Sequence, residues 1–242
     1  MSDVPDTFKA EAASIGLEFE DGDLERLSDF LDLLYDANAR MNLTAIRDRD
    51  EAWHRHVLDG LTLVPWIAAA HEKAAARGES PSLIDVGSGG GLPGLVLACV
   101  QPSLPITLVE ATGKKARFLE EAAKRLGLDR VEVLAERAEV VGRDPRHRER
   151  HDLVTSRAVG PMPILAEYLV PLARTDGLVL AVKGARAEEE VAEAKQALYH
   201  LHAEVVEVRP TSTGRIVVLA KKRAVPKAYP RAVGEPKRRP LA

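Results

Sequence analysis

The sequence predicts an α/β protein with a seven-stranded, mostly parallel sheet, an antiparallel hairpin at the sheet edge and a helical N-terminal extension. From residue 82 onward, short β-branched or leucine-rich runs alternate with helical segments, which is typical of a parallel sheet with crossover helices. The last two apolar runs are joined only by Arg209–Arg215, which is too short for a crossover helix and therefore predicts an antiparallel pair. Before residue 82 the apolar positions follow a helical period.

The N-terminal extension, residues 1–80, is expected to pack its helices on the sheet domain. The first long helix is predicted over residues 23–40, because its leucines recur at spacings of three and four. These leucines are Leu24, Leu27, Leu31 and Leu34. A second helical stretch carries Trp53, Val57 and Leu61 on one face.

The sheet domain is expected over residues 81–222. Its seven predicted strands are Leu83–Val86, Ile106–Glu110, Val131–Ala135, Leu153–Ser156, Leu178–Val182, Val205–Val208 and Ile216–Ala220. Helices are predicted at Leu92–Val100, Lys114–Leu126, Pro163–Ala173 and Ala187–His202.

Composition and charge exclude several classes of protein. The 242 residues are 45% hydrophobic and 29% charged, which is a globular balance and excludes extended disorder. No apolar run reaches the roughly 18 residues of a membrane helix, and the start of the chain lacks the basic and apolar pattern of a signal peptide, so we expect a cytoplasmic protein. The single cysteine, Cys99, excludes an internal disulfide and a four-thiolate zinc site. His54 and His56 point to different sides of a helix, so no metal is expected.

The charge is unevenly distributed along the chain. Residues 1–60 carry six Lys/Arg against 15 Asp/Glu, whereas residues 221–242 carry eight against one. The basic, proline-containing tail, residues 223–242, is therefore a segment that can follow a phosphate backbone, or equally a solvated and frayed C-terminus. The acidic N-terminal helices are not expected to be the main surface for a polyanion.

A glycine-rich turn follows the first predicted strand, at Asp85–Gly94. Gly89, Gly91 and Gly94 match G-x-G-x-x-G, so a nicotinamide or flavin dinucleotide is one candidate ligand. Asp85 argues against it, because an acid directly before the turn would face the pyrophosphate at high electrostatic cost. S-adenosylmethionine carries a sulfonium and an ammonium group and no phosphate. Asp85 therefore favours this methyl donor.

Glu110 stands at the end of the second predicted strand. Its carboxylate can accept both hydroxyls of a ribose, a role shared by dinucleotide and S-adenosylmethionine proteins. The other interpretation is an acid at the start of the following helix. After the third strand, residues 136–139 could meet an adenine edge.

Six motifs follow one another along the chain: Asn42–Ala45, Arg55–Asp59, Asp85–Gly94, Lys114–Leu119, Ser156–Ala158 and Lys183–Gly184. In this order they resemble the glucose-inhibited division protein B or RsmG family of bacterial small-subunit (16S) ribosomal RNA guanine-N7 methyltransferases, and the ending from Tyr229 to Lys237 resembles that of some members. The similarity runs from about Leu24 to Lys221. Glu110–Ala111 departs from the Asp-Ser of many members, and the loop Gly142–His151, rich in Arg and His, is an insertion.

The resemblance implies a Rossmann-like class I S-adenosylmethionine-dependent methyltransferase fold. It also implies cofactor contacts at Gly87, Leu92, Ala138, Glu139 and Arg157. The implied reaction transfers the methyl group to N7 of a guanosine and leaves S-adenosylhomocysteine. The expected partner is small-subunit ribosomal RNA or a ribosomal particle, with the enzyme acting as a monomer.

The residue inventory fits this reaction. Guanine N7 has a lone pair and no proton, so no general base is required and no catalytic residue is assigned. A pyrimidine C5 methyltransferase needs a nucleophilic cysteine, but Cys99 lies on an apolar helix face and is expected in the core. The Asn/Asp-Pro-Pro-aromatic loop of amino-group methyltransferases is replaced by Ser156–Val159.

Basic side chains supply the candidate RNA contacts. Lys114, Lys115 and Arg117 open a predicted helix, where cations oppose the helix dipole, and this cost suggests use on RNA phosphate, although a solvated helix face has the same pattern. Arg157 follows the fourth strand and is expected to contact the cofactor or the target base; a surface pair with Asp152 or Glu167 is the alternative.

A nicotinamide-dependent oxidoreductase and a non-catalytic RNA-binding module remain the competing functions.

Overall fold

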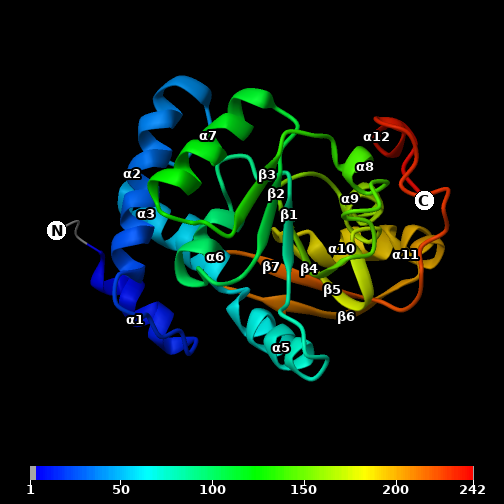
Figure 1. The fold of residues 1–242 in the computed structure, drawn as a ribbon, viewed down its shortest axis with the longest axis horizontal. Coiled ribbons are helices and arrows are strands. Elements are labelled where there is room, and N and C mark those ends of the chain that lie inside the picture. The colour runs from blue at the N-terminus through cyan, green and yellow to red at the C-terminus, as the bar shows by residue number, and fades with distance from the viewer. Residues whose placement is uncertain (1–3, 242) are drawn as a thin grey trace.

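A single sheet organises the chain, with helices on both of its faces (Figure 1). The structure, a computed structural model, describes residues 4–241. The strands are β1 (Leu83–Val86), β2 (Ile106–Val109), β3 (Val131–Leu134), β4 (His151–Arg157), β5 (Ala173–Lys183), β6 (Ala203–Pro210) and β7 (Arg215–Lys221). Their order across the sheet is β3-β2-β1-β4-β5-β7-β6.

The sheet is parallel except at β7. Strands β1 to β5 pair in parallel, while β7 lies between β5 and β6 and is antiparallel to both. The short Arg209–Arg215 connection reverses the chain, as its length predicts. The predicted seven-stranded sheet with an antiparallel edge hairpin is thus confirmed.

The central strands are buried on both faces, which explains their continuous apolar runs. Leu83 and Leu153 face one hydrophobic core, and Ile84 and Val154 face the other. This alternation follows from the two-residue period of a strand.

The N-terminal helices and the first two crossover helices cover one face. They are α1 (Asp6–Ser14), α2 (Asp23–Met41), α3 (Arg49–Ala52), the π-helix η1 (Trp53–Leu58), α4 (Asp59–Leu61), α5 (Val64–Ala75), α6 (Gly94–Val100) and α7 (Gly113–Arg125). Leu27, Leu31 and Leu34 of α2 are fully buried in this core, together with Trp53. The leucine stripe therefore attaches the N-terminal helices to the sheet domain.

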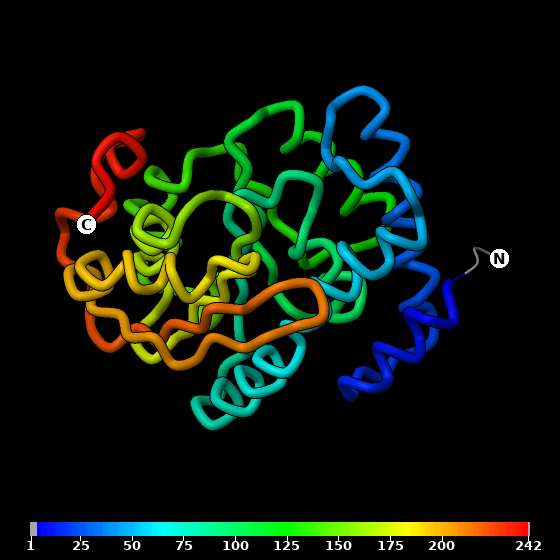
Figure 2. Tube along the Cα trace, turned by 180° about the vertical axis from the view of Figure 1, so that it is seen from behind, coloured from blue at the N-terminus to red at the C-terminus, as the bar shows by residue number. Residues whose placement is uncertain are grey.

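The other face is covered by helices from the second half of the chain. They are α8 (Ala138–Val141), α9 (Met162–Leu169), α10 (Ala187–Glu193) and α11 (Lys195–Leu201), and α12 (Glu235–Arg238) follows in the tail. The C-terminal tail lies at the opposite end of the molecule from α1 (Figure 2). Within residues 4–241, no helix combines the length and apolar character needed to span a membrane.

Two predicted helix boundaries were wrong. The helix predicted to reach Ala173 ends at Leu169, because Pro171 lacks the backbone N–H that a continuing helix needs, and Ala173 instead begins β5. The helix predicted over residues 187–202 is two helices, because Ala194 leaves helical geometry with φ −85° and ψ 2°.

Candidate cofactor and substrate site

The candidate site lies at the carboxyl ends of the parallel strands. The chain proceeds outward from β1 to β2 and β3, then returns to place β4 on the other side of β1. This reversal is a topological switch point, where the loops after adjacent strands diverge and leave a crevice. The predicted motifs at residues 85–94, 110, 136–139 and 157 all stand at this edge.

The glycine-rich turn after β1 is shaped by close packing. Gly87 has φ +75°, and a Cβ placed on it would lie 2.3 Å from Cγ2 of Val159. A Cβ on Gly94 would lie 2.3 Å from Leu108 and 2.8 Å from Oδ2 of Asp85. Only glycine allows the loop after β4 and the start of α6 to approach β1 so closely.

Asp85 lies beneath this turn and is fully buried. Its Oδ2 accepts a hydrogen bond from the Gly94 N–H at 3.2 Å, which ties β1 to the start of α6. Its Oδ1 has no hydrogen-bond partner. Burial raises the pKa of Asp85 to about 7, outweighing the contacts from Ser88 and the Gly94 N–H and the charge of Arg157, all of which favour the anion.

Glu110 directly follows β2 and links the turn to the next helix. Its Oε2 accepts a hydrogen bond from the Gly89 N–H at 3.0 Å, and its Oε1 accepts one from the Thr112 N–H at 2.6 Å. Thr112 immediately precedes α7, so the helix-start interpretation of Glu110 describes one of its contacts. Each carboxylate oxygen has a further lone pair, so ribose hydroxyls can still be accepted.

A cavity of about 260 Å³ opens beside Glu110. It collects Gly87 from the end of β1, Glu110 from the end of β2, and Ala138 and Glu139 from the start of α8. Val159 after β4 and Tyr168 of α9 supply apolar and aromatic walls. Four residues predicted to bind the cofactor therefore line one cavity.

The other predicted cofactor residues lie around this cavity rather than in its wall. Asp85 is underneath, Gly89 holds Glu110 through its backbone, and Leu92 packs against the core on the N-terminal side. Cys99 is buried, and burial raises the pKa of its thiol to about 12, which fits the predicted core position.

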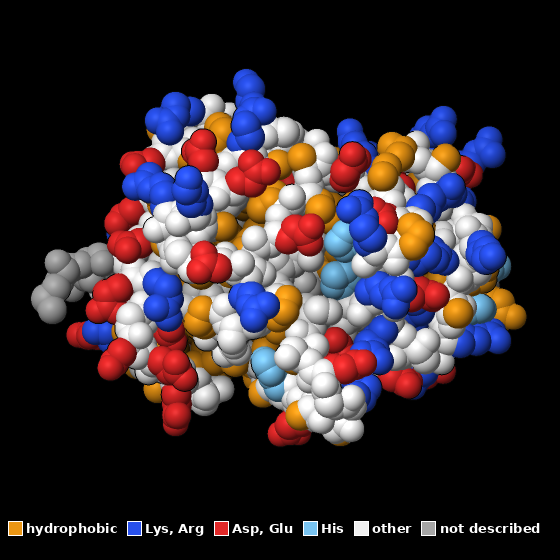
Figure 3. Space-filling view, viewed as in Figure 1, with side chains coloured by type: hydrophobic (Ala, Val, Ile, Leu, Met, Phe, Trp, Pro, Cys, Tyr) orange, Lys and Arg blue, Asp and Glu red, His pale blue; other side chains and the backbone are white. Residues whose placement is uncertain are grey.

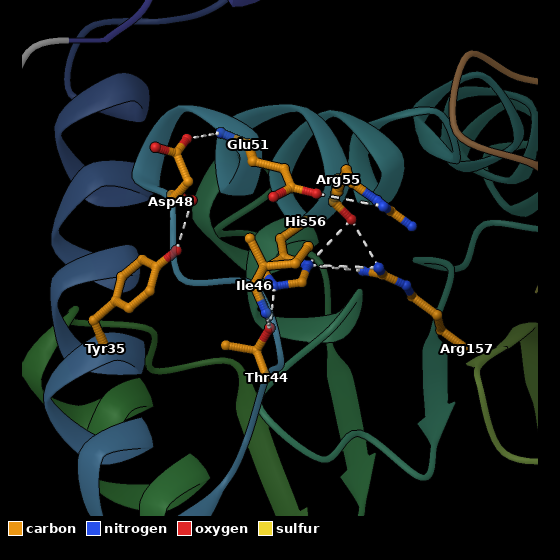
Figure 4. A network of polar contacts seen from close by, with 8 residues as sticks. All are labelled: Tyr35, Thr44, Ile46, Asp48, Glu51, Arg55, His56 and Arg157. Atoms are coloured by element: carbon orange, nitrogen blue, oxygen red, sulfur yellow. Dashed lines mark hydrogen bonds and ion pairs between the residues drawn. The ribbon is translucent and has the colours of Figure 1, made fainter.

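Arg157, at the end of β4, joins the sheet to the N-terminal helices (Figure 4). Its Nε lies 3.1 Å from Oδ2 of Asp59, and its Nη2 donates to the backbone oxygen of Arg55 at 2.7 Å. The alternative pairing with Asp152 or Glu167 is not observed, since those acids pair with other arginines. Its side chain retains 20% exposure, so the guanidinium is both anchored and accessible from the edge.

The N-terminal partners of Arg157 were not identified from the sequence as site residues. Asp59 also accepts a hydrogen bond from the Thr213 hydroxyl on the β6–β7 turn. His56 lies 3.5 Å from the guanidinium and 2.7 Å from the Thr44 hydroxyl. Burial and the Arg157 charge lower the pKa of His56 to about 4, so the imidazole is neutral at pH 7. The available sequence signal was the Arg55–Asp59 motif, which contains both His56 and Asp59. In the structure His56 lies on a π-helix, a feature that often marks functional sites.

The predicted RNA contacts occupy the first turn and a half of α7. Lys114 and Arg117 are exposed and Lys115 is half-buried. Within residues 4–241, none of the three forms an ion pair. Because α7 follows Glu110, these cations stand at the same edge of the sheet as the cavity.

Charge is segregated between the two ends of the molecule (Figure 3). Acidic side chains gather over α1 and α2, whereas Lys and Arg gather at the end that holds the C-terminal tail. In the part of the chain that the structure describes, no cluster of three or more His, Cys, Asp or Glu side chains could hold a metal ion.

The cavity fits a sulfonium nucleoside. Asp85 is buried under the adjoining glycine turn with its Oδ1 unpartnered, so it can favour a nearby cation through its charge without lining the cavity, and Glu110 offers acceptors for a ribose. Ala138 and Glu139 line the part of the cavity where the sequence predicts contact with an adenine edge.

The sequence comparisons identify one family. The family described as rRNA small subunit methyltransferase G matches residues 23–218. Proteins named ribosomal RNA small subunit methyltransferase G are 47% identical in Sorangium cellulosum, over 93% of this chain and 91% of that protein, and 44% identical in Roseiflexus sp., over 95% and 97%. The protein of that name in Pelotomaculum thermopropionicum is 39% identical over the full length of both chains.

The structural comparisons support the fold. Cofactor-bound Rv0187 from MTB superposes with a TM-score of 0.60 at 15% identity, over 92% of this chain and 99% of that chain. A methyltransferase from Geobacter sulfurreducens superposes with a TM-score of 0.54 at 14% identity, over 92% and 100%. The chain therefore has the Rossmann-like class I fold that the sequence predicts.

Proposed function

Because the chain belongs to the rRNA small subunit methyltransferase G family, we propose that it transfers a methyl group from S-adenosylmethionine to N7 of a guanosine in small-subunit (16S) ribosomal RNA. The observation that carries the proposal is that Gly87, Glu110, Ala138 and Glu139 line one and the same cavity at the switch point of the sheet. We further propose that it acts as a monomer in the cytoplasm. Methyl transfer to RNA distinguishes this function from that of a non-catalytic RNA-binding module, and the family membership does not favour a dinucleotide oxidoreductase.

Cofactor binding is assigned to the residues around the cavity. The cofactor supplies a methyl group made electrophilic by its bond to a sulfonium. Glu110 holds the ribose hydroxyls, while Ala138 and Glu139 meet the adenine. Asp85 places a negative charge under the turn, where it attracts the cationic end of the ligand.

The enzyme's task in the methyl transfer is positioning. An in-line displacement needs the nucleophile and the methyl carbon about 3–3.5 Å apart, and guanine N7 carries no proton to remove. Arg157 is assigned to hold the cofactor or the target base, because its guanidinium is fixed by Asp59 and Arg55 and stays partly exposed at the site. Lys114, Lys115 and Arg117 are assigned to RNA phosphate.

The test is incorporation of labelled methyl from S-adenosylmethionine into unmethylated small-subunit ribosomal RNA, offered both as naked RNA and as particles. The expected product is 7-methylguanosine, whose cationic ring makes the chain cleavable after reduction. Comparing the two substrates also shows which assembly state is used. Label found in a pyrimidine or an adenine would reject N7 of guanine as the acceptor.

A further inference from the structure

The C-terminal tail is held against the sheet domain by the inserted loop Gly142–His151. Arg148 of this loop donates to the backbone oxygens of Tyr229 at 2.6 Å, Val225 at 2.9 Å and Pro226 at 3.3 Å. Arg143 donates to the backbone oxygen of Pro230 at 2.7 Å. One loop therefore binds a run of tail carbonyls, which fixes the path of residues 225–230.

A buried ion pair fixes the next part of the tail. Glu167 of α9 is fully buried, and Arg231 binds both of its oxygens, with Nε 3.0 Å from Oε1 and Nη2 2.6 Å from Oε2. The Arg231 backbone N–H also donates to Oε1 at 2.7 Å. Because an unpaired buried carboxylate is costly, Glu167 requires the tail in this position.

Beyond Arg231 the tail reaches the cavity. The Gly234 N–H donates to Oε1 of Glu139 at 2.8 Å, and Val233, Gly234 and Lys237 line the cavity together with Glu110. Val233 is an apolar side chain with 52% exposure, and it stands where the tail forms part of the cavity lining.

We propose that residues 233–237 are a wall of the cofactor pocket that grips the adenosine part of the ligand. Val233 provides an apolar contact for the adenine, and the Gly234 N–H fixes the Glu139 side chain beside it. The loop Gly142–His151 supports this wall through Arg148 and Arg143. This inference rests on the proposed use of S-adenosylmethionine and extends the site beyond the sheet domain.

The test compares binding of S-adenosylhomocysteine by calorimetry in the full chain and in a chain truncated after Ala232. The truncation removes the wall, including buried Pro236, and keeps the Arg231–Glu167 pair, and thermal unfolding checks that the fold is retained. We expect affinity to fall at least about fivefold, since apolar contact with adenine is lost. Val233→Ala should show a smaller loss, roughly two- to fivefold.

A matched control is Val206→Ala, which shortens an exposed valine of β6 that does not line the cavity. The affinity of this variant for S-adenosylhomocysteine should equal that of the unchanged chain. Arg148→Ala should weaken binding and also speed amide hydrogen exchange over residues 225–237, a readout independent of activity.

Equal or tighter binding by the truncated chain would overturn the wall, because the segment would then be neutral or obstructive, while the proposed function would stand. If the full chain bound no S-adenosylhomocysteine, the proposed function and the wall would fall together.

Discussion

Glu110 is the residue whose chemistry is most directly testable. It is the acid at the end of β2 and accepts two backbone hydrogen bonds while facing the cavity. Glu110→Ala should weaken S-adenosylhomocysteine binding by about 10- to 100-fold, because hydrogen bonds to a charged group are lost. Calorimetry measures this, with Glu132→Ala on the exposed side of β3 as the control. An affinity equal to that of the unchanged chain would remove Glu110 from the site.

Asp85 predicts a pH dependence of cofactor binding. Its pKa is raised to about 7 in the folded chain, and a cationic ligand favours the anion. Below pH 7 a proton must be displaced, so the affinity for S-adenosylmethionine should fall toward acid by up to about tenfold per pH unit. Titrations of the chain with S-adenosylmethionine from pH 6 to 8.5 measure how steeply the affinity depends on pH. In Asp85→Asn this pH dependence should be weaker. A slope that is the same in both chains would contradict the role of Asp85.

His151 predicts a pH dependence of stability. It is buried at the start of β4 with neither ring nitrogen hydrogen-bonded, and burial lowers its pKa from 6.5 to about 4. Between those values the unfolded chain binds a proton that the folded chain does not, so the free energy of unfolding falls as pH drops from about 6.5 to 4. Denaturant unfolding at several pH values gives the slope of the free energy of unfolding against pH. In His151→Leu this slope should be smaller by up to about 1.4 kcal/mol per pH unit.

The exposed His200 provides the comparison for this measurement, and His200→Gln should leave the slope unchanged. If His151→Leu and the original chain lost stability in parallel, the buried imidazole would not be the cause.

At the scale of elements, the Asp59–Arg157 pair joins α4 to the end of β4. Asp59 is nearly fully buried, so Arg157→Ala should destabilise the fold by about 3–5 kcal/mol, because it leaves a buried charge unpaired. The double variant Asp59→Asn with Arg157→Ala should lose less than the sum of the single losses. Denaturant unfolding of the four chains measures the coupling, and additive losses would show that the pair does not hold these elements together.

The elements themselves were largely predictable. All seven strands were found, the central ones because apolar runs buried on both faces leave a strong signal. The partly exposed edge strands β3 and β6 were found because short valine-rich runs are typical of strands. The early end of α9 and the break at Ala194 were missed. Pro171 was a local signal that could have ended α9, whereas nothing in the alanine-rich run around Ala194 indicates a break.

The part of the candidate site that depends on local sequence could be predicted, and the part that depends on tertiary contacts could not. Glu110 was predicted from its place at a strand end, and Gly87, Ala138 and Glu139, which the family resemblance implies, line the same cavity. The contact between Asp59 and Arg157 joins distant segments of the chain, and so does the contact between Gly234 and Glu139. No periodicity or motif spacing encodes such long-range pairs, so the tail was considered only as a basic segment.

At the scale of the whole molecule, the exposed cations at the start of α7, next to the cavity edge, predict how RNA binds. Replacing Lys114, Lys115 and Arg117 by alanine should weaken RNA binding and reduce the slope of log affinity against log salt by up to about 2, because fewer counterions are released. Binding of S-adenosylhomocysteine should be unchanged. Filter binding over a salt series measures the slope.

The control for this surface lies on the same helix. Lys124 and Arg125 are exposed cations at the far end of α7, away from the cavity edge. Their replacement by alanine should leave the slope close to that of the unchanged chain. Equal effects of the two sets would indicate diffuse attraction rather than a defined RNA surface.

The most direct test of the account is an experimental structure with S-adenosylhomocysteine bound. The account predicts ribose hydroxyls within hydrogen-bond distance of Glu110, the adenine between Ala138–Glu139 and Val233, and the amino-acid part over the glycine turn toward Arg157. A ligand bound elsewhere, or a cavity that accepts a dinucleotide pyrophosphate over Asp85, would contradict it.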